Sequence, residues 1–332
     1  MTSLAEYTTL RVGGTPNSLT VATAEAQIID VVSQADSQGR ELLIIGSGSN
    51  LVISDEYAGD VLVIANKGIV NDASACAGAW VTVQAGESLD DFVALAVSSG
   101  WAGVETLSGV PGTVGATPIQ NVGAYGQQVS DTIAQVRAYN RETQKIETLF
   151  TQNCEFGYRS SIFKAHQNRW VILSVVFQLP LGTISQPISY NELAAKLDVE
   201  LGSRIALQEV RDAVLAVRAS KGMILSDSDH DTWSTGSFFT NPVVQAAPVG
   251  APTWPTADGQ TKVSAAWLIE HAGLGKGFGL NERVTISTKH TLAITNRGSG
   301  TATEVLELAD HIQKTVFAKF GISLDVEPQI VR

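Results

Sequence analysis

The stretch ELLIIGSGSNLVIS, residues 41–54, determines the expected fold. The apolar run Glu41–Ile45 predicts a buried strand, and Leu51–Ser54 predicts a second strand. Between them, Gly46–Asn50 offers backbone N–H groups without bulky side chains, as a bound phosphate or pyrophosphate requires. The loop is not a Rossmann fingerprint, because Leu51 stands where the third glycine belongs and a strand follows instead of a helix. The sequence therefore predicts a strand-loop-strand phosphate cradle, although a loop of this length is also consistent with an ordinary turn.

A second glycine-rich segment favours the functional interpretation. GVPGTVGATPIQNVGAYG, Gly109–Gly126, is much longer than a hairpin turn, and ordered loops of such length are usually functional. Its small residues would allow the backbone to approach a ring or a phosphate closely. Two of its apolar residues, Ile119 and Val122, are expected to be buried. Together the two segments predict a site for a dinucleotide. A third loop, Gly273–Gly279, fails as a P-loop because Gly277 follows the lysine.

Around these segments the pattern alternates between strands and amphipathic helices. Helices are expected where apolar stripes lie between capping residues and a glycine or a polar stretch: after Thr23, after Ser88, from Leu207, at Ala265–His271 and from Thr301 to Phe320. Strands are expected at Leu19–Ala22, Val61–Ala65, Val81–Ala85, Ala134–Tyr139, Trp170–Leu179, Val284–Ser287 and Thr291–Thr295, with a strand-like tail from Ile322. This mixture indicates an α+β protein with a domain boundary near Lys221.

Composition limits the possible functions. A chain of 332 residues is long enough for two or three domains, and its net charge of -11 without a basic run argues against nucleic acid or an anionic membrane as partner. The longest apolar-rich stretch, Trp170–Leu181, is too short to span a membrane. Cys76 and Cys154 have no CxxC spacing and the five histidines are scattered, so no disulfide framework and no metal site are expected. A cytoplasmic enzyme, expected to be monomeric, fits this composition.

Seven motifs in a fixed order give the chain a specific resemblance. They are RVGG at Arg11, IIGSGSNLVISD at Ile44, SGVPGTVGATPIQNVGAYG at Ser108, FGYRSSIFK at Phe156, GSFFTNPVV at Gly236, AAWLIEHAGLGKG at Ala265 and LDVEPQIV at Leu324. Over nearly its whole length the chain resembles the UDP-N-acetylenolpyruvoylglucosamine reductases, flavoenzymes that make UDP-N-acetylmuramate for bacterial peptidoglycan. The TPIQNVGAYG form and the segment that bears Tyr190 resemble the branch whose tyrosine loop closes over the substrate.

The resemblance implies an FAD-binding domain of the vanillyl-alcohol-oxidase (PCMH) type, at about residues 13–182, and a separate α+β substrate-binding domain. The expected division is residues 1–66 and 67–220 for two FAD-binding subdomains, joined by the tail 321–332, and 221–320 for the substrate. It also implies non-covalent FAD, NADPH as reductant and UDP-N-acetylglucosamine enolpyruvate as substrate. The expected cofactor-binding residues are Gly46, Ser47, Gly48, Ser49, Asn50, Gly112, Thr113, Gly115, Ile119, Asn121, Gly123 and Arg11.

The resemblance also assigns the chemistry to three residues. Hydride adds to the methylene carbon of the enolpyruvyl group, and Arg159 with a protonated Glu327 is expected to stabilise the enediolate-like intermediate at the adjacent carboxylate. Burial should raise the pKa of Glu327 so that it stays protonated. Ser237 is expected to donate the proton. The expected substrate-binding residues are Tyr158, Tyr190, Lys221, Asn241, Trp254 and either His290 or Lys289.

Two other functions are compatible with part of the pattern. One is an alcohol or hydroxy-acid oxidase on the same FAD scaffold. Many of these tether FAD through a histidine near the first glycine loop, and no histidine precedes His166 here. The other is a non-catalytic binder of sugar nucleotides, which the presence of Arg159, Ser237 and Glu327 disfavours.

Overall fold

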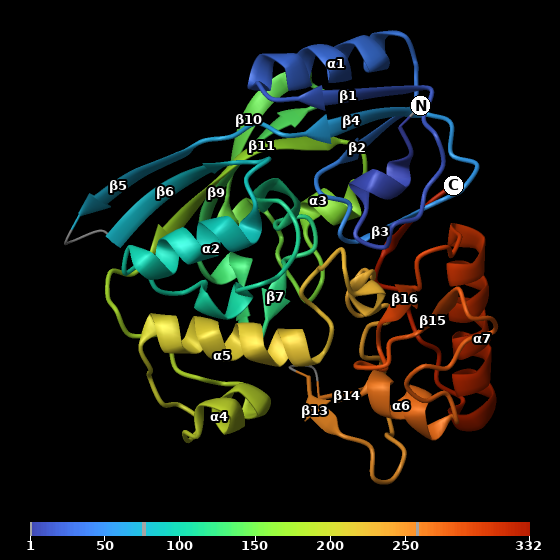
Figure 1. The fold of residues 1–332 in the computed structure, drawn as a ribbon. Coiled ribbons are helices and arrows are strands. Elements are labelled where there is room, and N and C mark those ends of the chain that lie inside the picture. The colour runs from blue at the N-terminus through green and yellow to red at the C-terminus, as the bar shows by residue number, and fades with distance from the viewer. Residues whose placement is uncertain (1, 75–77, 257–258) are drawn as a thin grey trace. The chain divides into compact units, whose positions relative to one another are not determined.

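The computed structural model describes residues 2–74, 78–256 and 259–332, and its chain divides into two compact units (Figure 1). Unit 1 comprises Met1–Pro16, Gly48–Ala58 and Ser220–Arg332, and unit 2 comprises Asn17–Ser47 and Gly59–Ala219. The chain therefore passes from unit 2 into unit 1 within the first glycine-rich loop, between Ser47 and Gly48. Each unit has its own hydrophobic core.

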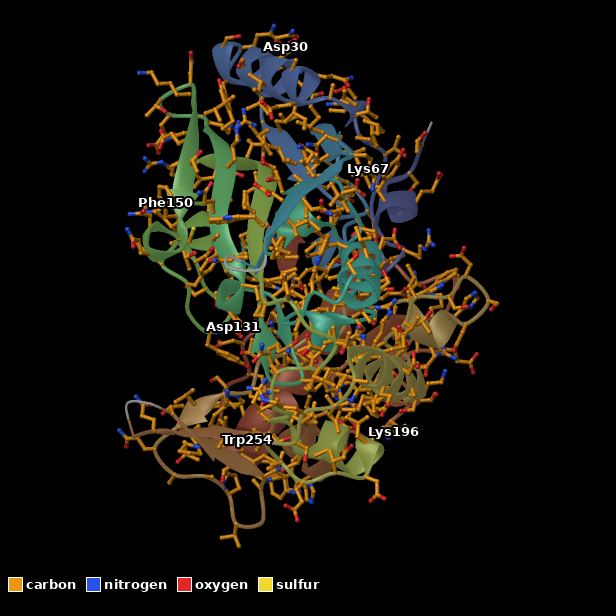
Figure 2. All side chains as sticks on the ribbon, turned by 90° about the vertical axis from the view of Figure 1, so that its left-hand side faces the viewer. Asp30, Lys67, Asp131, Phe150, Lys196 and Trp254 are labelled. Carbon is orange, nitrogen blue, oxygen red and sulfur yellow. The ribbon has the colours of Figure 1, made fainter. Side chains whose placement is uncertain are left out.

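Unit 2 begins with a three-stranded parallel sheet in the order β1-β4-β2, with α1 lying along it in Figure 1. The elements are β1 (Ser18–Ala22), α1 (Glu25–Ser37), β2 (Leu42–Ile45) and β4 (Asp60–Ile64). The apolar stripe expected after Thr23 comprises Ile28, Ile29, Val32 and Ala35. Three of these residues are buried as expected, and Ile29 is half-buried. Asp30, labelled in Figure 2, is exposed. This apolar face packs α1 against strands β1 and β4 of the sheet, and β4 pairs with β2, the strand that leads into the first glycine-rich loop.

The second sheet of unit 2 has five antiparallel strands in the order β10-β9-β11-β6-β5. They are β5 (Ile69–Ser74), β6 (Gly78–Gln84), β9 (Ile133–Asn140), β10 (Lys145–Phe150) and β11 (Trp170–Leu179). The two outer strands, β5 and β10, were not expected from the sequence. Each is an edge strand of this sheet and contains much polar sequence, so the apolar signal is weak. Phe150 at the end of β10 is exposed (Figure 2).

Besides α1, the described part of unit 2 contains four helices. They are α2 (Leu89–Ser98), α3 (Ile162–Ala165), α4 (Asn191–Leu197) and α5 (Leu207–Ser220), with short 3-10 turns at Leu4–Tyr7 in unit 1 and at Glu105–Leu107, Val114–Ala116, Val129–Asp131 and Thr151–Asn153 in unit 2. The expected cap of α2 is confirmed, because Ser88 Oγ accepts a hydrogen bond from the amide of Asp91. A small hydrophobic core joins α4 and α5, which lie side by side in Figure 1.

Unit 1 combines short strands with two helices. The elements are β3 (Leu51–Ile53), a 3-10 turn at His230–Thr232, β12 (Val243–Val244), β13 (Thr253–Pro255), β14 (Thr261–Val263), α6 (Ala265–His271), β15 (Val284–Ile286), β16 (Ile294–Asn296), α7 (Ala302–Phe320) and β17 (Gln329–Val331). The capping box of Thr301 and Glu304 on α7 is confirmed. The tail packs back as expected, since β17 pairs in parallel with β3.

One expected strand is shifted. β16 begins at Ile294 instead of Thr291, because the preceding residues form a turn in which Ser287 Oγ accepts bonds from the amides of Lys289 and His290. No helix among the described residues is long and apolar enough to cross a membrane, and in the same residues no group of three or more metal-ligating side chains occurs. Burial raises the pKa of Cys154 to about 12, and Cys76 lies outside the described residues.

Candidate active site

The first glycine-rich loop, Gly46–Asn50, connects β2 to β3 as the sequence predicts. Gly48 lies in unit 1 with a φ of +60°, and a Cβ there would stand 2.1 Å from the carbonyl oxygen of Tyr7. A side chain is therefore excluded both by the backbone conformation and by the N-terminal segment. The tight packing fixes the course of the loop.

The two glycine-rich segments meet within unit 2. A Cβ on Gly46 would lie 2.3 Å from Thr113 Oγ1, and a Cβ on Gly115 would lie 2.5 Å from the Cβ of Ala85. The amides of Val114 and Gly115 bond the carbonyls of Glu87 and Ala85, which ties the second segment to the turn after β6. Gly46 and Thr113, 67 residues apart in sequence, thus lie side by side on one glycine-lined surface of unit 2.

This surface has the donors that a pyrophosphate requires. Within residues 2–74, 78–256 and 259–332, the backbone amides of Gly46, Ser47, Gly112 and Thr113 donate no hydrogen bond to the protein. Ile119 is 41% exposed, so the expectation that it is buried was wrong. Its carbonyl is bonded by Ser161 Oγ, which holds the backbone and leaves the aliphatic side chain accessible. Unused amides beside an accessible apolar side chain fit the phosphate and ring portions of FAD.

Asn121 supports the second segment rather than the surface of the cradle. It is buried with a φ of +47°; its Nδ2 donates to Gln128 Oε1 and to the carbonyl of Gly157, and its Oδ1 accepts from the amide of Ser130. All three bonds are to protein atoms. Asn121 therefore links the segment to the turn that bears Arg159.

Arg159 stands at the tip of a tight turn in unit 2. The amide and carbonyl groups of Gly157 and Ser160 bond each other, and Arg159 between them has a φ of +52°. Its guanidinium donates to the carbonyl of Gly123 at 3.3 Å. The structure thereby brings the predicted catalytic arginine against the predicted cofactor residue Gly123.

The other two predicted catalytic residues converge in unit 1. The amide of Glu327 donates to the carbonyl of Phe238, the residue after Ser237, at 2.9 Å, and Phe239 pairs with Val326 in an antiparallel bridge. Both side chains are half-buried, and the Ser237 hydroxyl forms no hydrogen bond within the described residues. The Ser237 hydroxyl and the Glu327 carboxyl group therefore stand on paired segments.

The end of the first glycine-rich loop joins the same cluster of unit 1. Asn50 Nδ2 reaches the carbonyl of Glu327 at 3.5 Å, and the Asn50 carbonyl accepts from the amide of Gln329 at 3.0 Å. Thr9 Oγ1 donates to the carbonyl of Ser234 at 2.7 Å and also approaches the carbonyl of Ser49 at 3.5 Å. The N-terminal segment thus ties the cradle to the segment that leads to Ser237.

Arg11, an expected cofactor-binding residue, is held by protein groups. One guanidinium nitrogen is 2.6 Å from Asp227 Oδ1, and the guanidinium lies 5.6 Å from the ring centre of Trp233. Its Nε is buried and makes no hydrogen bond to the described residues. The ion pair and the ring hold the side chain, and its buried Nε is left unsatisfied by the described protein.

Tyr158 and Tyr190, both in unit 2, are partly exposed. Tyr190 precedes α4, and its ring meets Tyr125 edge to face with 5.4 Å between centres. Burial raises the pKa of Tyr190, with smaller contributions from Glu192 and Tyr158, so both tyrosines stand in one electrostatic neighbourhood. The Tyr190 hydroxyl therefore remains a protonated donor at neutral pH.

Lys221 and His290 are brought together in unit 1. Burial, followed by the charges of Lys221 and Lys276, lowers the pKa of His290 to about 4. Lys289 instead pairs with Asp229 at 2.6 Å. The charge of Lys221 thus acts on His290, which is neutral at physiological pH, and the aliphatic part of Lys289 also lies close to Lys221, beside Gly222.

The low pKa of His290 predicts a pH dependence of stability. The unfolded chain takes up this proton near pH 6.5 and the folded protein only near pH 4, so the free energy of unfolding should fall as the pH drops through that window, by at most about 3 kcal/mol. Urea unfolding at several pH values measures it. His290→Gln should flatten the dependence, and His166→Gln, at an exposed site, should not. Equal slopes in all three proteins would contradict the prediction.

Asn241 and Trp254 differ in whether the side chain is accessible to a substrate. Asn241 Oδ1 accepts the amide of Ala265 at the start of α6, so the side chain has a structural role. Trp254 lies on β13, in the three-stranded sheet β12-β14-β13 of unit 1, and is 41% exposed (Figure 2). Its indole face is thus open for stacking.

Sequence reasoning missed several residues that shape the site. Asp231 is buried and accepts from Ser287 Oγ, the amide and Oγ1 of Thr288, and Arg297, which fixes the turn before His290. Thr235, two residues before Ser237, has a buried hydroxyl without a partner in the described chain. Asp231 is one of three aspartates in the polar run SDSDHDT, residues 226–232, so nothing in the sequence distinguished it, and nothing marked Thr235.

The contact between Gly46 and Thr113 gives a second prediction. Gly46→Ala should weaken FAD binding at least about tenfold, a change of about 1.4 kcal/mol, because the new methyl group displaces Thr113 and its amide. Titration of the apo-protein with FAD, followed by flavin fluorescence, measures the affinity. The double variant Gly46→Ala with Thr113→Ala should regain part of the lost FAD affinity. Gly275→Ala, where the Cβ meets open space, is the matched control. An unchanged affinity in Gly46→Ala would refute the proposed cradle.

Comparison with known proteins gives a consistent result. A model of the UDP-N-acetylenolpyruvoylglucosamine reductase C-terminal domain matches residues 228–331, and a model of an FAD binding domain matches residues 16–148. The UDP-N-acetylenolpyruvoylglucosamine reductase of Cutibacterium acnes is 48% identical, over 99% of this chain and 89% of that protein. The one from Saccharopolyspora erythraea is 46% identical, over 99% and 94%.

A solved structure supports the same fold. The crystal structure of UDP-N-acetylenolpyruvylglucosamine reductase from Thermus caldophilus superposes with a TM-score of 0.68, covering 100% of this chain and 98% of that one. Its sequence is 22% identical to this chain. At that identity the superposition shows a shared fold. It agrees with the expected α+β class and FAD-binding domain.

Proposed function

Because the chain belongs to the UDP-N-acetylenolpyruvoylglucosamine reductases, we propose that Arg159, Ser237 and Glu327 carry out the chemistry of its reaction. The protein reduces the enolpyruvyl group of UDP-N-acetylglucosamine enolpyruvate in the synthesis of peptidoglycan precursors. FAD is its cofactor and NADPH its reductant. The residue roles below are our proposal.

Bound FAD supplies the hydride that adds to the methylene carbon of the enolpyruvyl group. The backbone amides of Gly46, Ser47, Gly112 and Thr113 would hold its pyrophosphate, since they have no acceptor in the described protein. Ile119 would provide an apolar contact for the ring system. Gly48, Ser49, Asn50, Gly115, Asn121, Gly123 and Arg11 would shape and support this binding site.

Arg159 and Glu327 stabilise the negative charge that develops at the substrate carboxylate. Hydride addition leaves carbanion character on the carbon beside that carboxylate, and delocalisation gives an enediolate. A guanidinium donor and a protonated carboxyl group each lower the barrier by roughly 3 kcal/mol when they are fixed in place. The bonds from Arg159 to Gly123 and from the Glu327 amide to Phe238 support such fixed positions.

Ser237 donates the proton that completes the reduction. A serine hydroxyl is a weak acid, but the carbanion is a strong base, so transfer is feasible when the hydroxyl is already aimed at the carbon. Within the described chain this hydroxyl has no competing acceptor. The hydrogen bond that places Glu327 beside the Ser237 segment is the single observation that best supports this assignment.

The sugar nucleotide would contact a separate group of residues. Tyr158, Tyr190 and Lys221 offer phenol and ammonium donors for its diphosphate, Trp254 offers a ring face for stacking, and His290 offers a neutral imidazole. Asn241 supports the site through α6. We also propose that the chain belongs to the branch with a tyrosine loop, that it acts in the cytoplasm and that it is monomeric.

Three measurements test this function. Purified protein should be yellow, release intact FAD on denaturation, and oxidise NADPH only when the enolpyruvyl sugar nucleotide is present. A protein that oxidises alcohols or hydroxy acids instead would indicate an oxidase on the same scaffold. A protein that binds the sugar nucleotide but takes up no reducible flavin would be a binder without catalysis, and the proposed residue roles would be wrong.

A further inference from the structure

A buried arginine that the reaction itself does not use stands behind the second glycine-rich segment. Arg218 lies in the last turn of α5 and is 8% exposed. Its Nε donates to the carbonyl of Gly109 at 3.0 Å, and its guanidinium also hydrogen-bonds the hydroxyl of Tyr125. Gly109 and Tyr125 are the first residue and the next-to-last residue of Gly109–Gly126. One side chain therefore bonds both ends of the segment.

The start of the segment is held from two sides. The Gly109 amide donates to Asp90 Oδ1 at 2.7 Å, while its carbonyl accepts from Arg218. Asp90 also accepts hydrogen bonds from both terminal guanidinium nitrogens of Arg211, about two turns before Arg218 on α5. Gly109 has a φ of +70°, and a Cβ there would meet Leu215 at 2.9 Å. Side chains of α2 and α5 therefore both hydrogen-bond the backbone of Gly109.

The end of the segment continues into the region of Tyr190. Tyr125 has a φ of +48° and packs against the core shared by α4 and α5. Its ring meets Tyr190 edge to face, and a Cβ on the following Gly126 would lie 2.1 Å from Ser189 Oγ. Burial raises the pKa of Tyr125 to about 12, so the hydroxyl stays protonated. The position of Tyr190 therefore depends on that of Tyr125.

A second buried side chain also links the end of the glycine-rich segment to the stretch that leads to Tyr190. Glu105 is fully buried; its carboxylate accepts from Gln127 Nε2 at 2.9 Å and from the amide of Gln186 at 2.9 Å. Gln127 follows the glycine-rich segment, and Gln186 begins the stretch that leads to Tyr190. Both stretches are thus fixed to one carboxylate, independently of Arg218.

We propose that Arg218 is a positioning residue, which holds the two ends of Gly109–Gly126 together and, through Tyr125, sets the place of Tyr190. The inference rests on the proposed role of this segment in holding FAD. A guanidinium is suited to the task because its planar fork donates in two fixed directions and its charge persists when buried. A lysine in its place has a single donor centre and cannot maintain both bonds in one geometry. Arg218 affects catalysis indirectly, through the position of Gly109–Gly126.

The test compares Arg218→Lys and Tyr125→Phe with matched controls in the same unit. Arg141→Lys alters a half-buried arginine that is paired with Asp36, and Tyr139→Phe removes a hydroxyl that bonds Ser33. Neither control touches the glycine-rich segment. Titration of each apo-protein with FAD gives the affinity, hydrogen exchange of the apo-proteins reports the order of residues 109–126, and steady-state kinetics at saturating FAD separate kcat from KM.

Arg218→Lys should weaken FAD binding about tenfold, and Tyr125→Phe should weaken it about threefold. Both variants should speed hydrogen exchange across residues 109–126. Both controls should stay within twofold in affinity and leave exchange in this segment unchanged. At saturating FAD the two site variants should raise the KM for the sugar nucleotide, since Tyr190 is displaced. The double variant should be no worse than Arg218→Lys alone, because both changes break the same bond.

A purely structural role predicts a different pattern. In that case all four single variants would lose thermal stability to a similar extent while FAD affinity, segment exchange and KM stayed at wild-type values, and the proposal would be overturned. Additive losses in the double variant would also overturn it. If the wild-type protein itself failed to bind FAD, the proposed function would fall, and the inference with it. If the wild-type protein bound FAD normally and Arg218→Lys and Tyr125→Phe behaved like wild type, the inference about Arg218 would be rejected and the proposed function would stand.

Discussion

Replacement of Ser237 by alanine is expected to lower turnover by about 10²- to 10⁴-fold, while NADPH still bleaches the absorbance of the bound flavin at a near-normal rate. The substitution removes the proposed proton donor. It leaves the backbone bonds of the segment intact, because the neighbouring Phe238 makes them with Leu292 and Glu327. Stopped-flow measurements separate the two half-reactions, and steady-state assays give the overall rate.

Ser234→Ala provides the matched control for this experiment. The Ser234 hydroxyl accepts the amide of Gly236 at 3.2 Å, so its loss costs about 1 kcal/mol of stability without removing a donor for the substrate. Turnover of this variant should stay within a few-fold of wild type. An equal loss of both half-reactions in Ser237→Ala would reject the proton-donor role and point to a damaged flavin site.

Replacement of Arg159 by methionine should reduce kcat by about 10²- to 10³-fold, since it removes a fixed positive charge from the carboxylate of the substrate as charge develops there. Methionine keeps much of the length of the side chain. Flavin reduction by NADPH should persist, because Arg159 acts after the reductant has left. Single-turnover experiments with the enolpyruvyl sugar nucleotide measure the affected step.

The result needs a control for the bond between Arg159 and the carbonyl of Gly123. FAD affinity of Arg159→Met, measured on the apo-protein, should remain within about threefold of wild type, because Asn121 still ties the same turn to the segment. Arg169→Met changes an arginine of the same unit that pairs with Glu142 and faces Trp170, and it should be active. A kcat near wild type in Arg159→Met would exclude the proposed role.

Local signals in the sequence predicted much of the fold. The caps at Ser88 and Thr301, the apolar stripe of α1 and the strands on both sides of Gly46–Asn50 all depend on residues close in the chain. The edge strands β5 and β10 escaped prediction because one side of each is unpaired and polar residues are tolerated there. Ile119 was misplaced because an apolar residue in a loop was assumed to be buried.

Only part of the candidate site could be predicted from the sequence. Glycine spacing by itself predicted a phosphate-binding loop, and the ordered series of motifs supplied FAD and the roles of Arg159, Ser237 and Glu327. Neither source indicated Arg218. An arginine near the end of an amphipathic helix is ordinarily a surface residue, and only its contacts show that it is buried behind the second segment.

The sequence alone determined that a strand-loop-strand cradle and a long glycine-rich segment exist, because turn and strand preferences are local properties. Tertiary structure decided that Gly46 abuts Thr113, that Glu327 pairs with the segment of Ser237 and that Arg218 closes Gly109–Gly126. These pairs are separated by tens of residues. Their contacts depend on how sheets and helices pack, which no short window of sequence encodes.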